Sequence, residues 1–212
     1  MTHIDYTLYL VTDRSVMSAK SLEQAVEQAI QGGCTVVQLR EKYASSREFF
    51  ETAQRVKQIT DSYHIPLIIN DRTDICLAVN AAGIHIGQQD LPAKIVRSMV
   101  GPDKIIGVSA ATLSEAIQAE QDGADYLGVG AMFATSTKTN TRPVTIEQLT
   151  QIKQAVQIPV VAIGGIQSSN VTTLTDTGID GIAVVSAILA RENITHAAEQ
   201  LKACFTGAGH EV

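Results

Sequence analysis

The stretch Gln38–Lys42 places an amide and two cations directly after Cys34–Val37, an apolar and β-branched run typical of a buried strand. Because side chains alternate along a strand, one face carries Val36, Gln38 and Arg40. The other face carries Val37 and Leu39 and suits a helix layer. Arg40 and Lys42 then bring two fixed positive charges to the carboxyl end of the strand. This arrangement is suited to binding an anion.

Two carboxylates follow the next two predicted strands. Asp71 comes directly after Pro66–Asn70, and Asp90 follows Gly83–Gly87. Two carboxylates from adjacent units can bind Mg²⁺, which keeps several waters and takes further oxygen ligands from phosphate groups. Asp71 could equally cap a helix and Asp90 could occupy a turn. The nearby cations Arg40 and Lys42 favour the metal interpretation, because together they form a charge-balanced diphosphate site.

A second anion site is predicted from glycines and a serine near the carboxyl end of the chain. Gly164–Gly165 follow one strand and Val185–Ser186 follow the last one. We expect free N–H groups at a helix N-terminus there, although a pair of glycines is also typical of a simple left-handed turn. Two anion sites on opposite sides of one cavity suit the joining of two phosphorylated molecules.

Lys138 lies in the Thr-rich segment Ala131–Pro143, a loop long enough to close over a ligand. We expect Lys138 to hold a leaving diphosphate and the loop to exclude water, the alternative being a solvated lysine. Two further residues of chemical interest, His85 and Cys34, lie in apolar strands and are predicted to be core residues.

Composition indicates an ordinary soluble protein. The chain has 212 residues with 45% hydrophobic and 18% charged, its formal net charge is −6, and no apolar run reaches the length of a membrane span. The acidic balance argues against nucleic-acid binding, and the amino-terminal residues lack signal-peptide features. Three cysteines without CxxC spacing suggest neither zinc nor disulfides. We therefore expect a cytoplasmic enzyme; a homo-oligomer is compatible with the sequence.

Strand and helix patterns alternate along the whole chain, which predicts a single domain over residues 1–212. The predicted strands are 6–12, 34–38, 66–70, 83–87, 104–108, 125–130, 159–163 and 181–184. The predicted helices are 21–32, 46–63, 71–78, the segment after Pro92, the segment after Thr112, 146–156, 169–177 and 194–205. Eight such units favour an α/β fold of the (β/α)₈ TIM-barrel type over a doubly wound sheet, and no GxGxxG or Walker A sequence is present. In a TIM barrel the polar residues at the strand ends meet at one face.

Taken together, the motifs resemble the thiamine phosphate synthase family over nearly the whole chain. The segments that carry the resemblance are Gln38–Lys42, Ile69–Arg72, Gly83–Leu91, Gly107–Ser109, Thr135–Lys138, Val161–Ile166 and Val185–Ser186. The resemblance implies a Mg²⁺-dependent transferase that joins hydroxymethylpyrimidine diphosphate to thiazole phosphate and releases diphosphate.

The resemblance also implies the roles of individual residues. The pyrimidine diphosphate would contact Gln38, Arg40, Lys42, Asn70, Ser109 and Lys138, with Ser109 and Lys138 as the catalytic residues. Asp71 and Asp90 would bind Mg²⁺. The thiazole phosphate would contact Thr135, Thr137, Gly165, Val185 and Ser186.

Three positions depart from the family pattern. The family commonly has a histidine at Ala111 and prolines at Ala131 and Ala134. The related thiazole tautomerase relies on a histidine in the region of Ala111, so its absence favours the synthase. A regulatory barrel that binds thiamine phosphates without turnover is a third hypothesis, and the retained Asp71, Asp90 and Lys138 argue against it.

Overall fold

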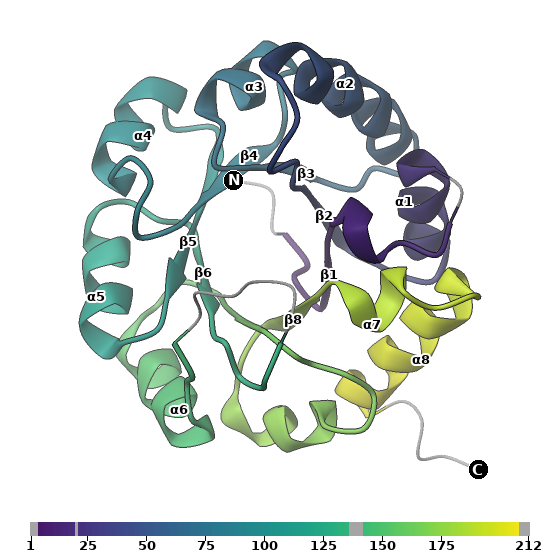
Figure 1. The fold of residues 1–212 in the computed structure, drawn as a ribbon. Helices are drawn as coiled ribbons and strands as arrows, with labels where there is room; N and C mark the ends of the chain where they lie inside the picture. Colours follow the sequence, from purple (N-terminus) through teal and green to yellow (C-terminus); the bar gives the residue numbers. More distant parts are fainter. Residues whose placement is uncertain (1–3, 20, 136–141, 208–212) are drawn as a thin grey trace.

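The computed structural model describes residues 4–19, 21–135 and 142–207. Within these residues, the strands pair in chain order as parallel neighbours, and β8 pairs with β1 to close a barrel (Figure 1). Helices surround the barrel on its outside. The predicted (β/α)₈ TIM barrel is confirmed.

The strands are short and lie where the alternating pattern predicts them. They are β1 Leu8–Val11, β2 Val36–Leu39, β3 Leu67–Asn70, β4 Gly83–Ile86, β5 Ile105–Ala110, β6 Tyr126–Val129, β7 Val160–Ile163 and β8 Gly181–Val184. The α-helices are α1 Leu22–Gln31, α2 Ser46–Ser62, α3 Thr73–Ala78, α4 Ala93–Val100, α5 Leu113–Gln121, α6 Ile146–Ala155, α7 Ser186–Leu189 and α8 Ile194–Thr206. Two 3₁₀ helices, η1 Arg14–Val16 and η2 Val171–Thr177, complete the described elements.

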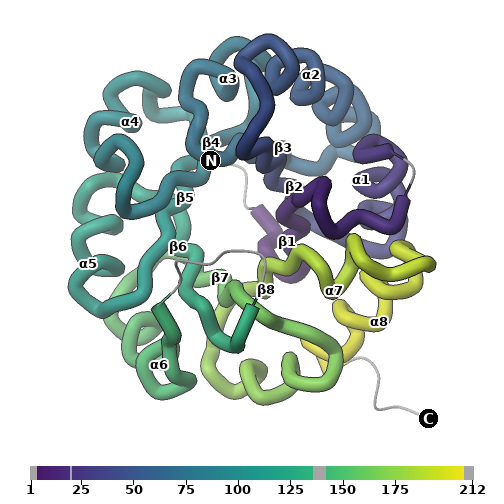
Figure 2. The backbone as a smooth tube through the Cα atoms, in the orientation of Figure 1, coloured from purple at the N-terminus to yellow at the C-terminus, as the bar shows by residue number. Residues whose placement is uncertain are grey.

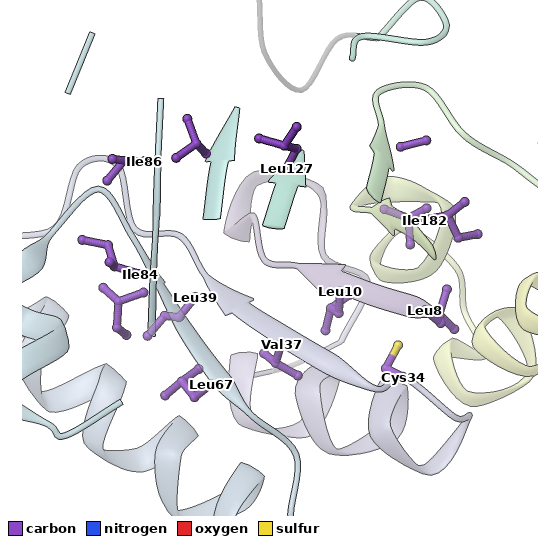
Figure 3. Packing of buried hydrophobic residues seen from close by; sticks show 14 of the residues in the cluster. Leu8, Leu10, Cys34, Val37, Leu39, Leu67, Ile84, Ile86, Leu127 and Ile182 are labelled. Atoms are coloured by element: carbon purple, nitrogen blue, oxygen red, sulfur yellow. The ribbon is translucent and has the colours of Figure 1, made fainter. Parts of the chain in front are cut away.

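The strands separate two sets of buried side chains. Outward-facing residues such as Leu10, Val37 and Leu39 pack against the surrounding helices in the larger cluster (Figure 3). The alternate residues point inward and form a separate cluster. Its members are Tyr6, Tyr9, Val11, Val36, Ile68, Tyr126, Val161 and Ala183. The predicted division of β2, with Val36 inside and its neighbours outside, is therefore confirmed.

Several helices begin at side-chain caps. Ser21 accepts a hydrogen bond from the Gln24 N–H at the start of α1, and Thr112 accepts one from the Glu115 N–H at the start of α5. The Glu115 carboxylate accepts from the Ala111 N–H, one residue before the cap. These contacts fix the first turns of α1 and α5.

One predicted helix differs from expectation, and two short helices were not expected. The segment predicted as a helix over 169–177 is the 3₁₀ helix η2, which ends at Gly178 in a left-handed conformation. Its residues are rich in threonine, whose branched side chain disfavours a regular α-helix. The short helices η1 and α7 were not predicted, because neither is long enough to show an apolar period.

The first and last strands of the described chain are neighbours in the barrel, and so are the helices beside them. Leu8 pairs with Ile182 between β1 and β8, and α1 packs beside α8 (Figure 2). The Thr195 hydroxyl donates to the Gln28 carbonyl, and the Lys202 ammonium donates to the Gly33 carbonyl. No helix among the described residues is long and apolar enough to cross a membrane.

Candidate active site

Gln38 and Arg40 lie at the carboxyl end of β2, where both have partners. Gln38 is only 4% exposed, and its Nε2 donates to the Tyr9 hydroxyl over 2.9 Å. The Arg40 Nη1 lies 3.0 Å from Asp13 Oδ2, and each of these side chains is 15% exposed. The Arg40 N–H donates to the buried Thr12 hydroxyl. The guanidinium is therefore held in place before any ligand binds.

The charges beyond β2 divide between the two sides of the strand end. The Glu41 carboxylate accepts from Arg14 Nε over 2.6 Å and is 9% exposed, so Glu41 pairs with Arg14 and not with Arg40. Lys42 is exposed and forms no ion pair with a described residue. The expected anion-binding stretch thus contributes one anchored cation and one solvated cation.

Asn70 and Asp71 end β3 beside the end of β4. Asn70 pairs with His85, and the Asp71 N–H donates to the His85 carbonyl over 2.9 Å. Asn70 is half-buried, and its side-chain amide has no hydrogen bond to any residue in the described ranges. This amide is available to a ligand at the mouth of the barrel.

The two aspartates predicted to bind Mg²⁺, Asp71 and Asp90, differ in their local structure. Asp71 is exposed and adopts a left-handed conformation with φ 63°, while α3 begins from Arg72 without a side-chain cap. Asp71 is therefore not the helix cap. Asp90 lies in a turn, where its carboxylate accepts from the Gly87 N–H over 2.7 Å.

The donor set at this edge fits magnesium rather than zinc. Among the described residues no group of three or more His, Cys, Asp or Glu side chains is placed to hold a metal. Mg²⁺ needs no such group, because one or two carboxylates together with waters and substrate phosphates complete its octahedron. Asp71 and Asp90 supply hard oxygen atoms from adjacent units, so their chemistry suits this ion.

Ser109 lies near the end of β5 with both its backbone and its hydroxyl fixed. Its carbonyl accepts from Gln88 Nε2 over 2.7 Å, and its hydroxyl lies 2.9 Å from His85 Nε2. Ser109 is half-buried, whereas His85 is buried as predicted and has a hydrogen-bonded neighbour at each ring nitrogen. Ser109 therefore presents one face to the mouth of the barrel.

The double glycine after β7 is shaped by a neighbouring segment of the chain. Gly164 and Gly165 have φ of 102° and 63°, and a methyl group on Gly165 would lie 2.5 Å from the Ala134 carbonyl. The Phe133 N–H donates to the Gly164 carbonyl. The close approach that the glycines permit is made by residues 131–134.

The helix N-terminus predicted for this second site follows β8, not the double glycine. Residues 166–170 separate Gly165 from η2, so no helix begins at the glycines. A helix does begin at Ser186, directly after β8, with Val185 as its first flanking residue. Of the loop residues predicted to bind substrate, Thr135 is described and half-buried, while Thr137 and Lys138 lie outside the described residues.

Three residues that structure this site were not predicted from the sequence: Asp13, Tyr9 and Tyr126. Asp13 follows β1, so the same attention to strand ends would have identified it beside Arg40. Tyr9 and Tyr126 are fully buried, and their hydroxyls lie 2.7 Å apart. Burial raises the pKa of both phenols, so both remain neutral hydroxyls at physiological pH.

Comparison with known proteins gives a consistent result along the chain. The family model described as thiamine monophosphate synthase matches residues 8–188. A thiamine-phosphate synthase of Ruminiclostridium cellulolyticum is 61% identical over 202 residues, which cover 95% of this chain and 96% of the relative. One from Methanobrevibacter smithii is 51% identical over 201 residues, covering 95% and 96%.

Solved structures match over the same length. A thiamine phosphate pyrophosphorylase from Pyrococcus furiosus superposes with a TM-score of 0.89 at 38% identity, covering 97% of this chain and 98% of that one. A geranylgeranylglyceryl phosphate synthase from Thermoplasma acidophilum has a TM-score of 0.73 at 18% identity over 95% and 94% of the two chains. The second likeness shows the barrel fold alone.

Proposed function

Because the chain belongs to the thiamine monophosphate synthase family, we propose that the residues at the carboxyl ends of β2 to β5 form a Mg²⁺-dependent site for hydroxymethylpyrimidine diphosphate. Thiamine-phosphate synthesis is the activity that accompanies this membership. The reaction forms a C–N bond between the pyrimidine methylene carbon and the thiazole nitrogen. Diphosphate departs with the electron pair of the C–O bond, and the nitrogen lone pair forms the new bond.

The pyrimidine diphosphate is assigned to the β2, β3 and β5 ends. Arg40 offers a guanidinium already oriented by Asp13, and Lys42 adds an exposed ammonium. Asn70 offers an amide, and Ser109 offers a hydroxyl held beside His85. Cations placed before the reaction stabilise charge that develops on the leaving group without reorganising. Lys138 is proposed to join them, as its place in the sequence suggests.

The metal is assigned to Asp71 and Asp90. When bound there, Mg²⁺ would neutralise negative charge on the diphosphate. The two carboxylates also require such a cation, because without it they would repel the anionic substrate. The support for this assignment is the position of the pair at the ends of adjacent strands and the oxygen chemistry of the donors.

The thiazole phosphate is assigned to the opposite part of the mouth. Gly165, Val185 and Ser186 follow β7 and β8, the usual position of a phosphate site in this fold, and Thr135 and Thr137 belong to the preceding loop. The two substrates would then approach each other across the barrel mouth.

The observation that carries the assignment is that two neighbouring strands end in polar groups: the pre-oriented Arg40 follows β2, and the Asn70 amide ends β3. The test combines the purified protein with both phosphorylated substrates, with Mg²⁺ or with a chelator, and measures thiamine phosphate and diphosphate by chromatography. We expect equimolar products with metal and strongly reduced formation without it. No thiamine phosphate would overturn the activity; full activity in chelator would overturn only the metal assignment. Cytoplasmic location, the absence of nucleic-acid binding and homo-oligomerisation remain predictions.

A further inference from the structure

Five side chains form a continuous hydrogen-bonded chain across the barrel interior. Gln38 Nε2 lies 2.9 Å from the Tyr9 hydroxyl, which lies 2.7 Å from the Tyr126 hydroxyl. The chain continues over 2.9 Å from Tyr126 to His85 Nδ1, and over 2.9 Å from His85 Nε2 to the Ser109 hydroxyl. These residues come from β2, β1, β6, β4 and β5. This hydrogen-bonded network thus connects Ser109 of the proposed pyrimidine site with Gln38, which the family resemblance also assigns to the pyrimidine.

Two glycines leave the space that the side chains of this hydrogen-bonded network need. A methyl group on Gly107 of β5 would lie 2.1 Å from Tyr126 Cζ, and one on Gly128 of β6 would lie 3.0 Å from His85 Cε1. Tyr6 also packs on Tyr126, with ring centroids 4.8 Å apart. The barrel interior is therefore built around the tyrosine and histidine rings.

Counting the protons shows which group donates in each hydrogen bond of the network. The Tyr9 oxygen accepts from the Gln38 amide, so its own proton goes to Tyr126. In the reverse direction, Tyr9 would receive two donors and its proton would have no acceptor among the described residues, although the side chain is only 1% exposed. An unsatisfied buried donor of this kind is strongly unfavourable. The forward direction gives the proton of each buried phenol an acceptor.

The same count determines the tautomer of His85. Tyr126 donates to His85 Nδ1, so the proton of the neutral ring lies on Nε2, which donates to the Ser109 oxygen. The Ser109 hydroxyl proton then has no role inside the barrel. This proton is therefore available to a ligand that binds at the mouth of the barrel.

We propose that His85 is a positioning residue, held as the Nε2–H tautomer by Tyr126, which makes the Ser109 hydroxyl a hydrogen-bond donor to an acceptor nitrogen of the bound pyrimidine. The inference rests on the proposed function, because it assumes that the pyrimidine binds beside Ser109. It goes further by specifying which partner donates. Tyr9 and Tyr126 act through His85 and need not touch the substrate.

The first test reads the tautomer in the protein without substrate. Long-range ¹H–¹⁵N spectra of histidine-labelled protein distinguish a protonated ring nitrogen from a bare one, and the His85→Gln spectrum assigns the signals. We expect a protonated Nε2 and a bare Nδ1 in the wild type, disturbed by Tyr126→Phe and unchanged by Tyr6→Phe. A protonated Nδ1 in the wild type would overturn the proposal. This result is independent of enzyme activity, so it is distinguishable from failure of the proposed function.

The second test asks whether His85 acts through Ser109. His85→Leu should lower kcat/KM for the pyrimidine diphosphate by about 10²-fold, because the donor that orients Ser109 is lost. His85→Gln keeps an amide donor and should recover at least tenfold of that loss. In the His85→Leu/Ser109→Ala double variant, the two losses should not add.

Controls separate positioning from folding. Tyr6→Phe removes a hydroxyl from the same aromatic stack but none from the chain, and should retain wild-type kinetics. Thermal unfolding of each variant identifies those that fail to fold. The wild-type spectrum tests the tautomer in any case, because it does not depend on a variant. Additive losses in folded variants, or equal losses for Gln and Leu, would contradict the proposal.

Discussion

At the scale of single residues, Asp71 has a backbone conformation that makes its charge easy to test. Its φ of 63° lies in the left-handed region, which aspartate and asparagine tolerate better than most other residues. Asp71→Asn should therefore keep the local backbone while removing a carboxylate. We expect Mg²⁺-dependent turnover to fall by about 10²-fold or more. Turnover measured across a magnesium titration checks this.

The matched control is Asp74→Asn. Asp74 belongs to the same segment, but its carboxylate pairs with the Arg72 guanidinium, which lowers the pKa of Asp74. The substitution Asp74→Asn should change turnover little at any magnesium concentration. If Asp71→Asn has near-normal activity, the metal site is misplaced.

Asp13 gives a second prediction at this scale, because it holds Arg40 without being an anion-binding residue itself. Asp13→Asn keeps the Arg40 charge but weakens its 3.0 Å anchor. A charge-assisted hydrogen bond of this kind is worth about 1.5–3 kcal/mol, so KM for the pyrimidine diphosphate should rise by about tenfold. KM for the thiazole phosphate should change little. Equal increases for both substrates would contradict the assignment of Arg40 to the pyrimidine side.

At the scale of elements, the contact of β5 with β6 depends on a residue without a side chain. Gly107 has no positive φ, but a methyl group there would lie 2.1 Å from Tyr126 Cζ. Gly178 is the reverse case, with φ 76° and no atom within 4 Å of an added methyl group. The two positions separate overpacking from backbone strain.

Gly107→Ala should lower the free energy of unfolding by about 3 kcal/mol, since the tyrosine ring must shift within a closed interior. Gly178→Ala should lower it by about 1 kcal/mol, the cost of a left-handed alanine. Urea unfolding monitored by circular dichroism measures both values. A loss at Gly107 no greater than that at Gly178 would mean that the Tyr126 ring does not pack against β5 as described.

At the scale of the whole molecule, the buried phenols link stability to alkaline pH. Burial raises the pKa of Tyr6, Tyr9 and Tyr126 above the ordinary tyrosine value of about 10. Above that pH the unfolded chain loses these protons while the folded chain keeps them. The stabilisation is therefore complete below pH about 10 and declines as the pH rises further.

The measurement is a titration that records tyrosinate absorbance and ellipticity together. Part of the tyrosinate signal should appear only as ellipticity is lost, and Tyr126→Phe should reduce that part. Tyr43→Phe should leave it unchanged, because Tyr43 is 97% exposed. Complete ionisation while the ellipticity is unchanged would contradict the prediction.

How much of this structure could be predicted from the sequence depends on how far apart the interacting residues are along the chain. Strand alternation correctly placed Val36 and Gln38 inside the barrel, because the alternation is local. The contact of Tyr9 with Tyr126 joins residues 117 positions apart and leaves no periodic trace. The approach of residues 131–134 to Gly164 is likewise a product of tertiary packing. The sequence could thus identify residues at the mouth, but not the interior contacts that orient them.

The pairing of β1 with β8 has a consequence for synthesis of the chain. The hydrogen-bonding edge of Leu8, Tyr9 and Leu10 that faces β8 is completed only by residues 182–184. A growing chain therefore carries an open sheet edge until its last strand leaves the ribosome. Such an edge invites pairing with other chains, and closing so long a loop is slow. The nascent barrel should depend most on chaperones just before its final strand emerges.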